Sequence, residues 1–95
     1  MNLIKTNIEG LFIIEPTIFK DKRGYFMESF NHKKFKNLFG EIVFLQDNES
    51  KSSKGVLRGL HFQKPPFAQT KLVRCLKGEI LDVALDLRKK STTYG

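Results

Sequence analysis

The sequence predicts an all-β fold, a barrel or sandwich with one short helix. Several short apolar runs of strand length are separated by glycine, proline and polar turn residues. In residues 79–87 apolar and other side chains alternate, which gives one strongly apolar face. Only residues 31–39 place their apolar side chains at helical spacing. Many short strands with one helix are typical of barrels and sandwiches.

The first third of the chain predicts two strands around a turn. Residues 11–16 form an apolar run that ends at a proline, and Tyr25 to Phe30 form a second run. Residues 19–24 between them predict a turn, because Gly24 can adopt a positive φ.

Residues 31–39 carry the end signals of a helix. The side chain of Asn31 can accept a hydrogen bond from the free amides of the first turn. Phe30 and Phe35 occupy the positions of a hydrophobic staple, and Gly40 is a typical C-terminal cap. The predicted apolar face consists of Phe35, Leu38 and Phe39.

The second half of the chain predicts further strands at residues 42–45, 56–62, 71–76 and 79–87. The polar stretch 47–55, with three serines, predicts a mobile loop, and Lys77-Gly78 predicts a tight hairpin. An open half-barrel ending near Gly95 would leave an unpaired edge and an exposed apolar face. We therefore expect either a fragment of a larger barrel or a chain that needs a partner to close it. As an isolated monomer, the chain is expected to have low solubility. A naturally short protein is the alternative.

Composition limits the class of protein. The 95 residues allow one domain, residues 1–95, and 40% apolar with 28% charged residues does not match a disordered chain. No apolar run reaches the length of about 18 residues that spans a membrane, and residues 1–10 lack the apolar core of a signal peptide. We expect a cytoplasmic protein. Cys75, the single cysteine, excludes an internal disulfide and is expected to be a buried, inert thiol.

The net charge of +7 favours an anionic partner. The basic residues are scattered, and neither a basic stripe with interleaved aromatic residues nor a helix-turn-helix or zinc pattern is present. A phosphorylated small molecule explains a few well-placed arginines equally well, so we expect no nucleic-acid partner.

Residues 55–63 are the densest unusual stretch, an apolar strand that carries Arg58, His61 and a glutamine. On a regular strand Arg58 and His61 point to opposite faces, unless Gly59 forms a bulge. The stretch can be compared with the cupin metal signature, in which a glycine and five residues precede His-x-His, a glutamate and a later glycine. Gln63 replaces the second histidine.

Lys71 stands where that signature has its glutamate, while Gly78 fits its end. Because a lysine repels a metal ion, the pattern predicts a cupin-type (jelly-roll) β-barrel whose metal site has another use. A neutral imidazole is a base near physiological pH, and an ammonium group can stabilise an oxyanion. His61 and Lys71 are thus candidates for proton abstraction next to a carbonyl. From the residues alone, a core histidine and an exposed lysine remain open alternatives.

An ordered series of motifs covers nearly the whole chain. Residues 21–29 are similar to D-x-R-G-x-F-x-E-S, residues 46–50 to Q-D-N-x-S, and residues 56–63 to V-L-R-G-L-H-x-Q. Residues 71–75 and 78–83 continue the series. Together they resemble the N-terminal part of the dTDP-4-dehydrorhamnose 3,5-epimerases. The resemblance implies a metal-independent cupin-type barrel that forms a homodimer and needs no cofactor.

The resemblance also implies a reaction and its residues. Carbons 3 and 5 of dTDP-4-dehydro-6-deoxy-D-glucose flank a ketone, so each proton can leave through an enolate and return on the other face, as dTDP-L-rhamnose biosynthesis requires. His61 matches the general base and Lys71 the residue that steadies the enolate oxygen. The matched substrate-binding residues are Arg23, Glu28, Gln46, Asn48 and Arg58. Without the resemblance, these would be ordinary turn, strand and loop residues.

Some parts of the expected site have no match in this sequence. The family's proton-donating tyrosine, its second histidine and the carboxylate that orients the base match positions after Gly95, and Tyr94 does not fit the donor motif. Asp82 is a candidate charge partner for Lys71. The open alternatives are a nucleotide-sugar 3-epimerase or ketoisomerase of the same fold, and a non-catalytic fragment that only binds dTDP-sugar or only dimerises.

Overall fold

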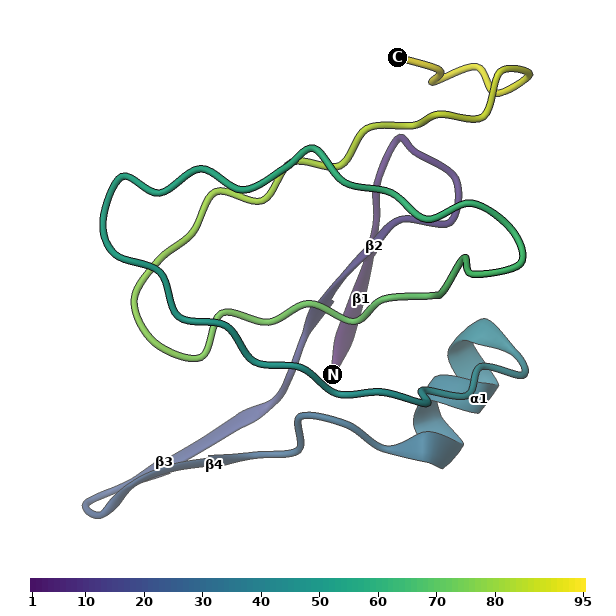
Figure 1. Cartoon of the computed structure of the whole chain (residues 1–95). Helices are drawn as coiled ribbons and strands as arrows, with labels where there is room; N and C mark the ends of the chain where they lie inside the picture. The colour runs from purple at the N-terminus through teal and green to yellow at the C-terminus, as the bar shows by residue number, and fades with distance from the viewer.

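The structure, a computed structural model, describes all of residues 1–95. It contains two two-stranded antiparallel sheets and one helix (Figure 1). β1 (Asn2–Lys5) pairs with β2 (Phe12–Glu15), and β3 (Ile18–Asp21) pairs with β4 (Gly24–Met27). The chain is therefore mostly β with one short helix, as predicted, but its strands do not close into a barrel.

The β1–β2 sheet brings the N-terminus against one of the predicted strands. Leu3 lies opposite Ile14 and Ile4 opposite Ile13. Leu3 and Ile14 are half-buried whereas Ile4 and Ile13 are exposed, so the sheet has one inward face. β1 was not predicted, because four residues are too few to establish an alternating pattern; its pairing with β2 makes it a strand.

β3 and β4 form a hairpin that projects from the rest of the molecule (Figure 1). The predicted turn is shorter in the structure, since residues 18–21 belong to β3. Gly24 has a φ of 137°, as the turn prediction required. The Asp21 Oδ1 atom accepts a hydrogen bond from the Arg23 amide at 2.8 Å, which closes the turn.

The helix α1 (His32–Phe39) confirms its predicted end signals. Asn31 Oδ1 accepts a hydrogen bond from the Lys34 amide at 3.0 Å. Gly40 has a φ of 82°, and its amide donates to the Lys36 carbonyl at 2.9 Å. These contacts fix both ends of the helix at the residues that the sequence indicated.

A cluster of phenylalanines between α1 and its neighbours forms the apolar core. Phe35 is only 3% exposed and is the one buried apolar residue. Its ring centroid lies 4.8 Å from that of Phe30, which confirms the staple, and 6.2 Å from that of Phe44. Phe39 lies 5.3 Å from Phe12 of β2, so the cluster joins the helix to the first sheet.

The strands predicted after α1 are wrong for this chain. The segments 42–45, 56–62, 71–76 and 79–87 run as extended chain around a wide open loop and have no strand pairing (Figure 1). Their alternating pattern is real, but a strand needs a neighbour that satisfies its backbone groups. The backbone hydrogen bonds of residues 42–85 only close local turns, such as that from the Val56 amide to the Ser53 carbonyl at 3.3 Å.

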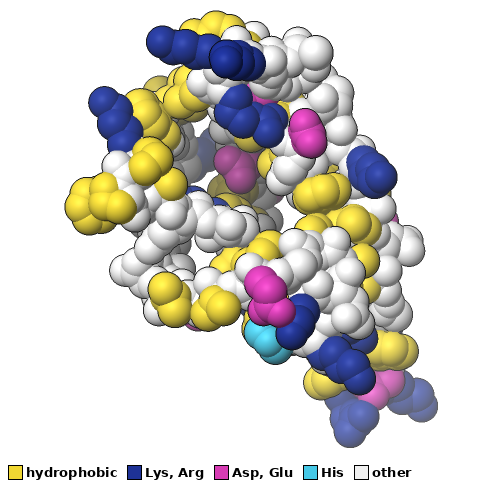
Figure 2. All heavy atoms as spheres, turned by 90° about the vertical axis from the view of Figure 1, so that its right-hand side faces the viewer, with side chains coloured by type: hydrophobic (Ala, Val, Ile, Leu, Met, Phe, Trp, Pro, Cys, Tyr) yellow, Lys and Arg dark blue, Asp and Glu magenta, His cyan; other side chains and the backbone are white.

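Lack of pairing leaves these segments open to solvent. Leu57 and Leu81 are both 92% exposed. Cys75, predicted to be buried in a strand, is exposed for the same reason. Figure 2 shows apolar and basic side chains intermingled around an open hollow on one face of the molecule.

No helix in the chain has the length and apolarity that crossing a membrane requires.

Candidate functional site

The predicted site residues lie on separate parts of the chain. Arg23 is in the β3–β4 turn and Glu28 follows β4, whereas the others belong to the extended segments after α1. All of them are exposed: Arg23, Glu28, Gln46, Asn48, Arg58, His61 and Lys71. No hydrogen bond or ion pair joins any two of them, so this chain does not by itself assemble them into one enclosed site.

Arg23 is oriented by the aspartate two residues before it. The Arg23 Nη2 and Nε atoms lie 2.6 and 3.2 Å from Asp21 Oδ2. This pair raises the pKa of the Arg23 guanidinium and holds the pKa of the Asp21 carboxyl below its ordinary value. The Arg23 side chain is still 90% exposed, so its remaining donors are free to bind an anion.

Glu28 is held against the start of α1. Its carboxylate accepts hydrogen bonds from Lys34 Nζ at 2.8 Å and from Asn31 Nδ2 at 3.2 Å. These two donors, Lys34 first, lower the pKa of the Glu28 carboxyl. Glu28 is therefore an anion that links β4 to the helix, and its contact with substrate stays a prediction.

Gln46 lies beside the segment that leads to Lys71. It lines a shallow hollow together with residues 41–45 and 68–70. Since Lys71 directly follows this lining, Gln46 and Lys71 are on neighbouring segments. Asn48, two residues further along, is exposed and outside any helix or strand.

Arg58 is tied to the serine-rich loop before it. Its Nε atom donates to Ser52 Oγ at 2.9 Å, and its Nη2 atom donates to the Lys51 carbonyl at 3.3 Å. Gly59 has a φ of 120°, so the backbone leaves regular strand geometry between Arg58 and His61. The bulge predicted as a possibility at Gly59 is not formed, because no paired strand surrounds this residue.

His61 and Lys71 have the chemistry of a base and an oxyanion-stabilising cation, but both face solvent. Such groups act most strongly where water is excluded. The ion pairs of the structure do not include Lys71 or Asp82, so the expected pair between them is not formed. No group of three or more His, Cys, Asp or Glu side chains is placed to hold a metal ion.

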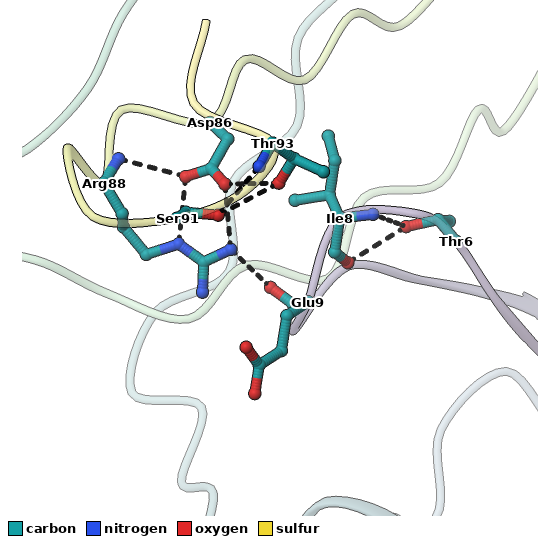
Figure 3. Close-up of polar contacts among 7 residues, drawn as sticks. All are labelled: Thr6, Ile8, Glu9, Asp86, Arg88, Ser91 and Thr93. Carbon is teal, nitrogen blue, oxygen red and sulfur yellow. Dashed lines mark hydrogen bonds and ion pairs between the residues drawn. The ribbon is translucent and has the colours of Figure 1, made fainter.

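One polar cluster was missed by the sequence analysis. Asp86 is the only buried polar or charged residue, and its carboxylate contacts Arg88, two residues later, and Thr93 (Figure 3). The signal in the sequence is Asp-x-Arg, the spacing also found at Asp21 and Arg23. The alternating pattern of residues 79–87 places Asp86 on the less apolar face of an expected strand and gives no sign of its burial.

Residues 5–95 match the family model described as dTDP-4-dehydrorhamnose 3,5-epimerase. The enzyme of that name from Shigella flexneri is 59% identical over 96 residues, which are 100% of this chain and 53% of the relative. The one from Methanothermobacter thermautotrophicus is 59% identical over 92 residues, covering 97% and 49% of the two chains.

The solved structures agree with the sequence comparison. The crystal structure of dTDP-4-dehydrorhamnose 3,5-epimerase from Elizabethkingia anophelis NUHP1 has a TM-score of 0.89 and 58% identity, covering 99% of this chain and 52% of that one. The chain belongs to the dTDP-4-dehydrorhamnose 3,5-epimerase family. It spans about half the length of the curated relatives it matches.

Proposed function

We propose that this chain is part of an enzyme that inverts carbons 3 and 5 of dTDP-4-dehydro-6-deoxy-D-glucose. The product is dTDP-4-dehydro-L-rhamnose, an intermediate of dTDP-L-rhamnose biosynthesis. The observation that carries the proposal is the match of nearly the whole chain, residues 5–95, to the epimerase family model. Named relatives with 41–59% identity over the chain support it.

In the proposed mechanism His61 removes a proton from the carbon next to the ketone. Lys71 donates a hydrogen bond to the oxygen on which the enolate charge develops, which lowers the barrier to this step. The ketone itself acidifies both protons, so the reaction needs no metal or cofactor. Arg23 and Arg58 bind the diphosphate, because a guanidinium offers paired donors to phosphate oxygens. Glu28, Gln46 and Asn48 contact the nucleotide sugar.

The proposed active form is a closed cupin-type barrel in a cytoplasmic homodimer. The unpaired segments after α1 and their exposed leucines support this form, because strand pairing would satisfy their backbone groups and cover their apolar faces. The high structural similarity to a chain about twice as long also supports it. Neither a nucleic acid nor a membrane has a role in this proposal.

Proton exchange tests the proposal directly. The chain is incubated with dTDP-4-dehydro-6-deoxy-D-glucose in deuterated water, and the protons on carbons 3 and 5 are followed by NMR. The variants are His61→Ala and, as a matched control, His32→Ala, which changes the other histidine, exposed at the start of α1. Exchange by the isolated chain is expected to be slow, because its site residues are exposed, and to be kept in His32→Ala but lost in His61→Ala.

The other outcomes separate the competing functions. Exchange and inversion at carbon 3 alone would indicate a 3-epimerase, and migration of the carbonyl would indicate a ketoisomerase. A folded chain that binds dTDP without any exchange would retain binding alone, as in the non-catalytic alternative. Exchange that survives in His61→Ala would exclude His61 as the base.

A further inference from the structure

The Asp86 carboxylate is buried and fully partnered. The residue is 6% exposed, and its side chain accepts hydrogen bonds from the Arg88 amide at 3.0 Å, Arg88 Nε at 2.9 Å and Arg88 Nη2 at 3.1 Å. Thr93 Oγ1 donates a further bond at 2.7 Å. A buried charge is tolerated only with such a set of donors.

The same contacts fold the end of the chain back on itself. The Gly95 amide donates to the Asp86 carbonyl at 2.9 Å, and the Ser91 amide donates to the Arg88 carbonyl at 2.9 Å. Ser91 Oγ accepts from the Thr93 amide at 3.2 Å, which positions the threonine hydroxyl beside the carboxylate (Figure 3). Residues 86–95 therefore form a closed loop around one carboxylate.

Arg88 extends from this loop to the other end of the sequence. Its Nη2 atom donates to the Glu9 carbonyl at 2.8 Å, across 79 positions of the chain. Glu9 lies in the turn between β1 and β2. A hydrogen bond within this turn stabilises it, because the Thr6 hydroxyl donates to the Leu11 carbonyl at 2.9 Å. No other hydrogen bond in the structure joins residues more than 16 positions apart.

We propose that Asp86, Arg88 and Thr93 form a clasp that fixes the C-terminal loop to the β1–β2 turn. Asp86 locks the guanidinium of Arg88 in one orientation, and Arg88 then holds the backbone of Glu9. The clasp thereby sets where the segment 79–87 ends relative to the first sheet. It uses none of the proposed catalytic or substrate-binding residues, so it stands independently of the proposed reaction.

Amide hydrogen exchange measured by NMR tests the clasp in the whole chain. Asp86→Asn removes the charge but keeps the shape, and Asp82→Asn is the matched control, an exposed aspartate on the same segment that belongs to none of the ion pairs. We expect about tenfold faster exchange at the amides of Arg88, Ser91 and Leu11 in Asp86→Asn only. Equal exchange at Leu11 in wild type and Asp86→Asn would refute the clasp.

Faster exchange at the amides of α1 would show that Asp86→Asn unfolds the chain. In that case two further variants test whether the clasp holds the β1–β2 turn. Arg88→Gln removes the hydrogen bond from the guanidinium to the Glu9 carbonyl, and it is expected to accelerate exchange at the Leu11 amide without affecting α1. Lys89→Gln is its control. Thr93→Val removes one donor to the carboxylate and should accelerate exchange at Arg88 by a smaller factor. Unchanged exchange at the Leu11 amide in Arg88→Gln would show that the contact between Arg88 and Glu9 does not hold the β1–β2 turn in place.

Discussion

Two Asp-x-Arg pairs show how the same local motif serves different purposes. In the β3–β4 turn the carboxylate of Asp21 is 52% exposed, whereas that of Asp86 is 1% exposed. An exposed ion pair contributes about 0–1 kcal/mol, because water and salt screen it. The sequence could predict each pair from its spacing, but not the difference in burial, which depends on Thr93 and on a turn far away in the chain.

Arg23 should therefore matter for binding and little for stability. We predict that Arg23→Gln weakens binding of dTDP about tenfold, because one charged hydrogen-bonding group to phosphate is lost. The midpoint of urea unfolding should stay unchanged, since the side chain is 90% exposed. Isothermal titration calorimetry measures the first effect, with Lys22→Gln in the same turn as control. A loss of binding as large in Lys22→Gln would mean that only net charge matters.

Asp86 should make the clasp sensitive to strong acid. Hydrogen bonds from Arg88, then from Ser91 and Thr93, hold the pKa of the Asp86 carboxyl well below its ordinary value of 3.8. Since the folded pKa is lowered, the stabilisation is fully present above pH 3.8 and is lost as the pH falls toward the folded pKa. The charged groups that face this carboxylate are Arg88, which remains a cation, and the carboxylate of Glu9, which also interacts with Arg88.

The measurement is the exchange protection of the Arg88 and Gly95 amides between pH 6 and pH 2, corrected for intrinsic rates. In the wild type, protection of these amides should persist below pH 3.8. In Asp86→Asn, protection should be lower than in the wild type at every pH and should change less with pH. Loss of protection in the wild type already at pH 5 would show that the carboxylate does not carry the clasp.

At the scale of elements, the sequence predicted those that depend on local signals. α1 was correct from its cap at Asn31 to Gly40, and β2 was correct to within a residue at each end. The strands after α1 were not, because pairing joins distant segments and alternation alone does not supply a neighbour. Likewise, motifs identified His61 and Lys71 as candidates, but no local pattern indicates whether their segments come together.

Replacing either of two asparagines by alanine should change the stability of α1 in opposite directions, because only one of them caps the helix. Asn31→Ala removes the acceptor for the Lys34 amide and should destabilise the helix by about 1 kcal/mol. Asn37→Ala, at an exposed position in the last turn of the helix, should instead stabilise it by about 0.5 kcal/mol through higher helix propensity. Circular dichroism during urea unfolding measures both. Equal effects of the two variants would contradict the capping role.

The phenylalanine cluster is the element that stability depends on most. Phe35→Ala removes the ring that contacts Phe30, Phe39 and Phe44, and should cost about 3–5 kcal/mol. For a small domain this is a large share of the total, so we expect loss of a cooperative thermal transition in calorimetry. Phe19→Ala, at a ring that is 62% exposed on the hairpin, is the control and should change the transition little.

The whole molecule exposes more surface than a folded protein of its mass. Its accessible area is 9534 Å², whereas a monomer of 11.0 kDa is expected to expose about 5,600 Å². Its radius of gyration of 15.6 Å also exceeds the value of about 12.4 Å expected for this length. The excess area of roughly 3,900 Å² is of the size buried in obligate assemblies. The low solubility expected from the sequence stays a prediction, which this large exposed surface supports.

We predict that the isolated chain associates as its concentration rises. Sedimentation velocity should show species heavier than 11.0 kDa, because exposed leucines and unpaired backbone favour contacts between chains. Leu81→Lys places a charge on the apolar face of segment 79–87 and should move association to about tenfold higher concentration, the loss expected from one buried leucine. Asn37→Lys adds the same charge on α1 and is the control. A chain that stays monomeric at every concentration, or an equal shift in the control, would show that this face does not drive association.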